Sequence, residues 1–194
     1  PSQAVASLSS CPRPWLVGVL HLPALPGAPG SVASLDAIAR NAAEDAATLE
    51  ACRFSAVMIE NYHDVPFNAG RVEPETTAAM AVVAHQVRTA VSLPVGVNVL
   101  RNDGLSALGI AAAAGLSFLR VNVLAGTVAT DQGLVHGEAH ELLRRRAALD
   151  VCEVVREGAL VAATAAAGDE ELAKRLAARA NLLSQRLGLL LRLR

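Results

Sequence analysis

The sequence predicts an α/β fold built around a parallel sheet, and three observations carry this prediction. Short and wholly apolar runs, such as LVGVL at 16–20, are typical of strands that are buried on both faces. Between these runs lie alanine-rich segments whose apolar residues recur at helical spacing. Strand and helix alternate along the chain at the spacing of βα units, which bring parallel strands together through right-handed crossovers.

The first predicted βα unit runs from the strand at 16–20 through a loop rich in proline and glycine at 21–30. Its helix is expected to begin after Ser34, because serine is a favoured N-cap and apolar residues then recur every three or four positions. The second unit has a strand at 55–60 and a helix at 74–91, where a proline suits the first helical turn.

The third predicted unit is a strand at 94–100 and a helix at 103–114, with an aspartate as its cap and Gly115 as its end. The fourth unit is a strand at 117–123, a long polar loop, and a helix from about 137 to 149. Four βα units therefore precede residue 150.

The pattern changes after residue 150. We interpret 151–158 as an extension of the preceding helix, 159–163 as a fifth short strand, and 168–194 as an amphipathic helix with an arginine-rich end. The leucine face of that helix packs on the domain or lies on a membrane or partner. The predicted organisation is a disordered N-terminal segment at 1–14, a βα portion at 15–150 and a divergent helical tail at 151–194.

Composition excludes several classes of protein. The 17 basic residues are matched by 18 acidic ones and aromatic residues make up 3% of the chain, which argues against a nucleic-acid surface. The three cysteines, Cys11, Cys52 and Cys152, have neither the number nor the spacing of a disulfide framework or a zinc site. No apolar run reaches the roughly 18 residues of a membrane span.

Polar side chains follow every predicted strand, at the edge where parallel α/β folds bind their ligands. Such side chains can position a small polar substrate and move a proton. The candidates for acid/base catalysis are Glu60, Asp131, His21 and Asp103. The candidates for substrate binding are Asn61, Asp64, Asn98, Arg101, Asn102, Asn122 and Gln132.

Each candidate also has a structural interpretation. Asn98 and Asn122 lie in apolar strands and can satisfy each other inside a barrel, and Asp103 can cap the next helix or pair with Arg101. For Glu60 we favour a functional role. Burying a carboxylate at the end of an apolar strand is costly unless the carboxylate is paired with another group or needed for the chemistry. The HGEAH segment at 136–140 lacks the order of helix-borne zinc ligands, so no metal is predicted and any cofactor is unknown.

Five segments at these strand ends resemble the BtpA family. They are GVLHLPALPG (18–27), ENYHDVPF (60–67), GRVEPETTAAM (70–80), PVGVNVLRND (94–103) and RVNVLAGTVATDQG (120–133). The resemblance runs from about residue 17 to 149 and implies part of a (βα)8 TIM-barrel-like fold of the ribulose-phosphate-binding type, with four to five βα units here. It also implies a role in photosystem I biogenesis, assembly or stabilisation, peripheral to thylakoid membranes.

The residues themselves support an alternative, a TIM-barrel enzyme that acts on a small anionic substrate, such as a phosphosugar or a nucleoside-like molecule, by acid/base chemistry. The expected partners are photosystem I assembly components or the thylakoid surface, and a small anionic ligand, but not nucleic acid. The expected location is the cytoplasm or the chloroplast stroma.

Length sets one further expectation. A complete barrel of this kind needs about 250 residues, so the first 150 are interpreted as its front half and the chain as truncated. Four or five parallel strands without closure leave an open sheet edge, through which we expect the chain to assemble with copies of itself.

Overall fold

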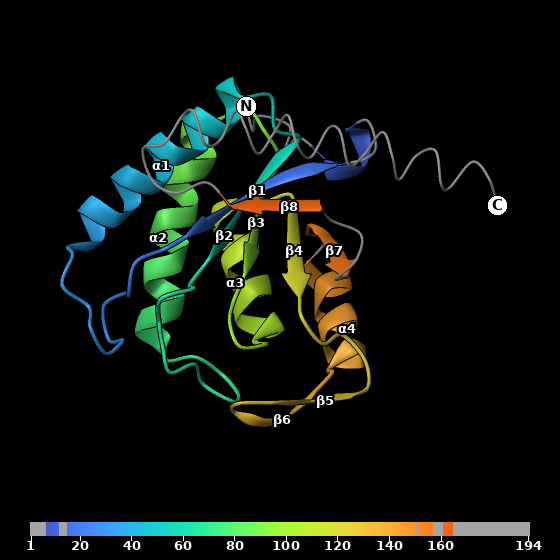
Figure 1. Ribbon diagram of the computed structural model, residues 1–194. Coiled ribbons are helices and arrows are strands. Elements are labelled where there is room, and N and C mark those ends of the chain that lie inside the picture. Colours follow the sequence, from blue (N-terminus) through green and yellow to red (C-terminus); the bar gives the residue numbers. More distant parts are fainter. Residues whose placement is uncertain (1–6, 12–14, 150, 157–160, 165–194) are drawn as a thin grey trace.

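The computed structural model describes residues 7–11, 15–149, 151–156 and 161–164, and these form a parallel sheet with helices packed on its outer face (Figure 1). The sheet strands are β1 (Leu16–His21), β2 (Ala56–Glu60), β3 (Val95–Asn98), β4 (Phe118–Val121), β7 (Glu153–Arg156) and β8 (Val161–Thr164). The helices are the 3₁₀ turn η1 (Leu8–Ser10), α1 (Leu35–Ala51), α2 (Pro74–Ala90), α3 (Gly104–Ala114) and α4 (Ala139–Leu149). A separate hairpin is formed by β5 (Thr127–Thr130) and β6 (Gly133–His136).

The strand order β7-β4-β3-β2-β1-β8 is that of βα units added side by side, and every neighbouring pair is parallel. β8 comes last in the described chain and pairs with β1, which is where the last strand of a βα barrel lies. Within the described residues, β7 and β8 are the two outer strands of the sheet. The predicted α/β class with parallel βα units is confirmed.

The two faces of the sheet carry different residues because side chains alternate along each strand. Val57 and Ile59 of β2 belong to the main core between the sheet and the helices. Met58 lies on the opposite, inner face, in a second apolar cluster with Val19 and Phe118. Leu8 of η1 and Trp15, also buried, belong to this second cluster, so the amino-terminal part of the inner face is apolar.

The helix boundaries follow the signals in the sequence. Ser34 caps α1, with its hydroxyl oxygen accepting a hydrogen bond from the N–H of Ala37. Asp103 caps α3 through the N–H of Ser106, and Gly115 ends that helix in the left-handed conformation that glycine adopts at low cost.

Replacing Ser34 by alanine is expected to lower the free energy of unfolding by about 1 kcal/mol, because the first turn of α1 loses its capping acceptor. Urea unfolding followed by circular dichroism measures this change. Ser31→Ala, in the loop before the helix, is the matched control and should change stability by less than about 0.5 kcal/mol. Equal stability of the two variants would contradict the capping role.

Over its described residues, 7–11, the amino-terminal segment contains η1, which buries Leu8, and the Ser7 hydroxyl and Ser9 N–H donate to the Glu153 carboxylate. Two predictions about later segments were wrong. Residues 153–156 do not extend α4; they form β7 beside β4. The expected fifth strand corresponds to β8, whereas the amphipathic helix predicted at 168–194 lies outside the described residues.

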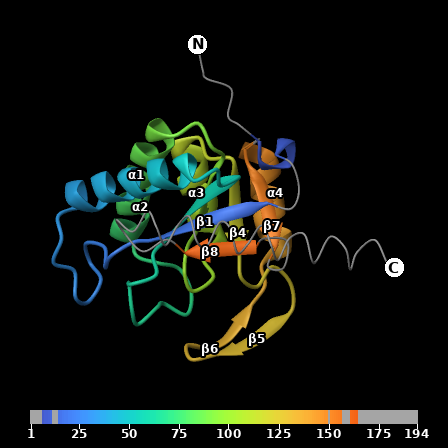
Figure 2. The same cartoon turned by 45° about the horizontal axis from the view of Figure 1, so that its top comes forward.

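The polar loop after β4 is the second correction, because it contains the antiparallel hairpin β5–β6. Figures 1 and 2 show this hairpin beyond the tip of β4, apart from the six-stranded sheet. Val128 and Leu134 are exposed on it, which explains why no buried apolar run marked these strands in the sequence.

Candidate active site

The inner face of the sheet changes from apolar to polar at the carboxyl ends of β1 to β4. The register places His21 beside Glu60 and Glu60 beside Asn98, all on the face that also carries Val19 and Met58 two residues earlier. A polar layer therefore lies directly on an apolar one, at the end of the strands where βα folds place their chemistry.

Glu60 is the centre of this layer and is 5% exposed. Its carboxylate lies 3.2 Å from Nε2 of His21 and accepts a hydrogen bond of 2.6 Å from the Asn98 amide. The guanidinium of Arg120 is 3.7 Å away. A buried carboxylate is costly without such partners, and here an imidazole, an amide and a cation all face it.

His21 lies between Glu60 and solvent, with 27% of its side chain exposed. Its ring stacks on Tyr62, with centroids 4.1 Å apart and planes within 10°. Burial lowers the pKa of His21, and the nearby His63 and Arg120 act in the same direction, outweighing the opposite effect of Glu60. The imidazole is therefore neutral at neutral pH and able to accept a proton.

Asn98 and Asn122 do contact each other, as the structural interpretation of these residues expected. The Asn98 amide donates to Asn122 Oδ1 at 3.2 Å as well as to Glu60, and Asn122 donates in turn to the backbone carbonyl of Arg101. This chain of amides links the ends of β3 and β4 to the carboxylate.

Asn61 and Asp64 follow Glu60 closely in the sequence, but their side chains bond to each other and to the neighbouring loops. Asn61 accepts from the N–H of Leu100 at 2.8 Å and donates to Asp64, which accepts from the N–H of Leu25 at 2.7 Å. These buried side chains tie together the loops that follow β1, β2 and β3. Asn102 has a similar position, bonded through both amide atoms to the backbone of Val123.

Asp103 holds the loop after β2 to the first turn of α3. Its two oxygens accept hydrogen bonds from the backbone N–H groups of Val72 and Ser106, from the Ser106 hydroxyl and from Arg71. Arg71 also pairs with Glu138, which joins the loop after β2 to the start of α4. These contacts favour the structural interpretation of Asp103 over the catalytic one.

Arg101, Asp131 and Gln132 form a loose group at the hairpin turn. The guanidinium of Arg101 lies 3.9 Å from the Asp131 carboxylate, whose side chain is 73% exposed, and Gln132 donates to the same carboxylate. An exposed pair at this distance contributes little to stability. Arg101 meets the hydrogen-bond network of Glu60 through its backbone carbonyl, which accepts from Asn122, and not through its side chain.

Sequence reasoning missed Arg120 and Tyr62. Arg120 lies two residues before Asn122 in the sequence. Because residues two apart in a strand face the same side, this spacing could have placed Arg120 beside Asn122. Tyr62 follows two polar residues in a loop, and no spacing in the sequence predicts that it stacks on His21.

No group of three or more His, Cys, Asp or Glu side chains is placed to hold a metal within the described part of the chain. The two histidines of HGEAH separate, since His136 is in β6 and bonds to Thr127 whereas His140 is in α4. The cysteines are free thiols, and burial raises the pKa of Cys152 to about 11, so it is not an activated nucleophile.

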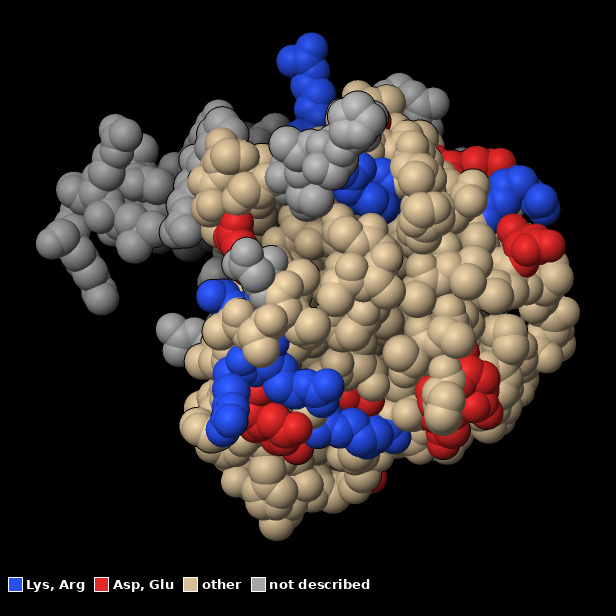
Figure 3. All heavy atoms as spheres, turned by 180° about the vertical axis from the view of Figure 1, so that it is seen from behind, with Lys and Arg blue, Asp and Glu red and all other residues tan. Residues whose placement is uncertain are grey.

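The surface has no dominant sign of charge on the face drawn in Figure 3, where basic and acidic side chains lie next to one another around a wide uncharged area. Among the helices that the structure describes, none is both long and apolar enough to cross a membrane.

A parallel βα sheet with a polar layer at the carboxyl ends of its strands defines a protein of the βα-barrel type. Within this class the chain belongs to the BtpA family, whose family model matches residues 13–178. The match extends beyond residue 150, past the point where the motifs in the sequence stopped, and includes β7 and β8.

Three relatives illustrate the range of the family. An uncharacterized protein of Thermococcus kodakarensis is 50% identical over 69% of this chain and 52% of its own length. The photosystem I biogenesis protein BtpA of Synechocystis is 45% identical over 68% of this chain and 46% of its own length. An uncharacterized mitochondrial protein of Caenorhabditis elegans is 31% identical over 75% of this chain and 54% of its own length.

The chain thus spans about half the length of the curated relatives it matches. Among solved structures, a 2-keto-3-deoxy-6-phospho-gluconate aldolase from Zymomonas mobilis has a TM-score of 0.40 at 15% identity, covering 89% of this chain and 95% of that chain. This likeness is too low to indicate a shared chemistry.

Proposed function

We propose that this chain carries the acid/base half of a βα-barrel enzyme site that acts on a small anionic substrate. The observation that supports it is the pairing of a neutral imidazole with a buried carboxylate, His21 and Glu60, 3.2 Å apart on the inner face of the sheet. Catalytic pairs of this kind recur where a carboxylate orients a histidine and stabilises its protonated form.

The contacts assign a role to each residue of the layer. His21, which is neutral and partly exposed, accepts a proton from the substrate, and Glu60 then stabilises the imidazolium across the same contact. Asn98 holds the other carboxylate oxygen and so fixes the direction in which Glu60 faces. Arg120 brings a positive charge to the same layer, which favours a phosphosugar or a nucleoside-like substrate with an anionic group.

Proton transfer can be tested without knowledge of the product. The chain is incubated in heavy water with a panel of phosphosugars and nucleosides, and exchange of carbon-bound protons is followed by NMR. Glu60→Gln and His21→Asn should each slow exchange by about 100-fold or more, because they remove a general acid/base contribution of that size.

His85→Gln is the matched control, since His85 is exposed on α2 and has no place in the layer. Exchange that continues unchanged in Glu60→Gln would remove this proposal. The same assay on the full-length Thermococcus relative measures how much the second half of the family's length contributes.

The second candidate is a role in photosystem I biogenesis at the periphery of thylakoid membranes, from the cytoplasm or the chloroplast stroma. The 45% identity to the Synechocystis protein favours it, whereas a relative from an archaeon at 50% identity favours a role that does not depend on photosynthesis. Expression of this chain in a Synechocystis strain that lacks its own BtpA tests it, with photosystem I content and membrane fractionation as readouts.

Glu60→Gln separates the two candidates in that strain. Restoration of photosystem I by the chain and by Glu60→Gln alike would indicate an assembly role without the proposed chemistry. Failure of the wild-type chain to restore it would remove the second candidate for this chain.

A further inference from the structure

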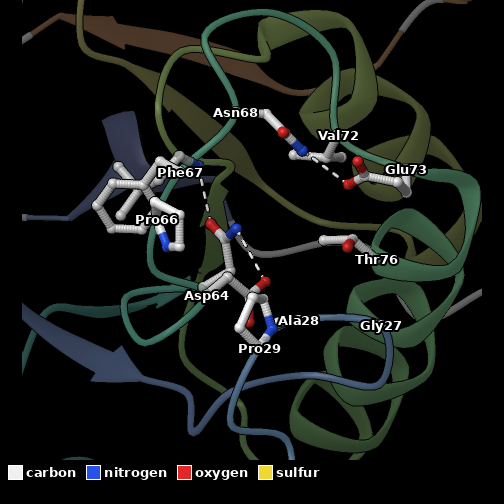
Figure 4. Close-up of a pocket in the computed structure, with 12 residues that line it drawn as sticks. Gly27, Ala28, Pro29, Asp64, Pro66, Phe67, Asn68, Val72, Glu73 and Thr76 are labelled. Atoms are coloured by element: carbon white, nitrogen blue, oxygen red, sulfur yellow. Dashed lines mark hydrogen bonds between the residues drawn. The ribbon is translucent and has the colours of Figure 1, made fainter. Parts of the chain in front are cut away.

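A cavity of about 260 Å³ lies outside the polar layer, between the loops after β1 and β2 and the first turn of α2 (Figure 4). Pro29, Pro66 and Phe67 form apolar parts of its wall, and Glu73 and Thr76 contribute polar groups from the start of α2. Neither His21 nor Glu60 lines it. Asn61 and Asp64 do line it, but the cavity is separate from the pair of His21 and Glu60.

Thr76 is the feature of this cavity that requires an explanation. The residue is 5% exposed, lines the cavity and points into it in Figure 4. Its hydroxyl makes no hydrogen bond to any residue that the structure describes, although the neighbouring Thr77 donates to the carbonyl of Glu73. The hydroxyl oxygen is not one of the fully buried side-chain atoms that lack a partner in the described structure, so it is open to the cavity, where a bound molecule can hydrogen-bond to it.

The charges in the wall decide which molecules fit. Two carboxylates, Asp64 and Glu73, line the cavity and no lysine or arginine does. Asp64 already accepts from Asn61 and from the N–H of Leu25, whereas Asn68 donates to one oxygen of Glu73 and leaves its other oxygen as an acceptor. Phosphates and carboxylates are therefore disfavoured by repulsion.

We propose that this cavity binds a small neutral polyol of monosaccharide size. A sugar hydroxyl both donates and accepts, so one can pair with the Thr76 hydroxyl while another donates to the Glu73 carboxylate. The faces of Phe67 and the prolines suit the C–H face of a sugar ring. A diamine would satisfy the carboxylates and could donate to the Thr76 oxygen, but it would leave the Thr76 hydroxyl hydrogen without an acceptor, since an ammonium group has none.

Saturation-transfer NMR on the full chain tests this proposal, with glycerol, ribose and glucose as probes and ribose 5-phosphate and putrescine as charged competitors. The neutral polyols should receive saturation that Thr76→Val reduces, whereas any saturation of ribose 5-phosphate, which the proposed acid/base site can bind, should be the same in the wild-type chain and in Thr76→Val. Thr76→Val should weaken binding by about fivefold, the effect of one lost hydrogen bond. Thr77→Val is the matched control, because it makes the same change one residue away without touching the cavity.

Thr76→Ser guards against a folding effect, because it keeps the hydroxyl and should keep the affinity. Binding of the polyols that survives Thr76→Val would overturn the assignment of the site. Binding of putrescine or ribose 5-phosphate that is preferred over the polyols and is weakened by Thr76→Val would overturn the ligand class. Absence of binding by all three polyols at millimolar concentration would overturn the proposal as a whole.

Discussion

Replacing Gly96 by alanine is expected to destabilise the fold by about 3 kcal/mol, near the upper end of the cost of overpacking a core. A Cβ at this position would lie 2.3 Å from Cε2 of Phe118 and within 2.5 Å of two further atoms of the same ring. Phe118 is fully buried in the inner apolar cluster, so its ring has no room to move away. Urea unfolding by circular dichroism measures the loss.

Gly109→Ala is the control, because the structure places nothing within 4 Å of a Cβ there and the position is exposed in the interior of α3. It should stabilise the protein by about 0.5–1 kcal/mol, so the same substitution has opposite signs at the two sites. Combining Gly96→Ala with Phe118→Leu should recover part of the loss, since the two residues share one space. Simple additivity of these two changes would contradict the steric explanation.

The sequence predicted the strands and helices around these residues because each apolar run had to be buried and each cap had a local chemical reason. It also placed His21, Glu60 and Asn98 at the same edge of the sheet, since parallel strands bring their carboxyl ends to one edge, and the register makes them neighbours there. Arg120 was missed although it lies within β4 two residues before Asn122, which the sequence did single out.

The remaining differences have physical causes that no local pattern contains. Asn61 and Asp64 hold loops that are close only after folding, so their partners, Leu25 and Leu100, could not be predicted. β7 has a charged residue at each end and only two apolar residues between them, and this composition does not separate a strand from the end of a helix.

Replacing Asp103 by alanine is expected to lower the free energy of unfolding by about 3 kcal/mol and so to affect folding before any chemistry. The side chain is 1% exposed and accepts four hydrogen bonds, and its removal would leave the N–H groups of Val72 and Ser106 without their acceptor. Arg71→Ala should cost less, about 1 kcal/mol, because Arg71 is partly exposed and its charge is screened.

The pH dependence of stability gives this prediction a second readout. Burial alone would raise the pKa of Asp103, but hydrogen bonds from Ser106, Val72 and Arg71 outweigh it and hold the pKa below its ordinary value. Since the pKa is lower in the folded state than the value of about 3.9 in the unfolded chain, the contribution is present above about pH 4. It is lost as the pH falls through the folded-state pKa, where the carboxylate takes up its proton.

The free energy of unfolding should therefore fall more steeply between neutral and acidic pH in the wild-type chain than in Asp103→Asn. The asparagine keeps one oxygen acceptor but cannot titrate. Asp131→Asn is the matched control, because that carboxylate is exposed at the hairpin turn and its removal should leave the pH profile unchanged. If Asp103→Asn retained the full acid dependence, the loss of stability would have to come from other carboxylates, and the network around Asp103 would not be what holds the loop after β2 to the start of α3.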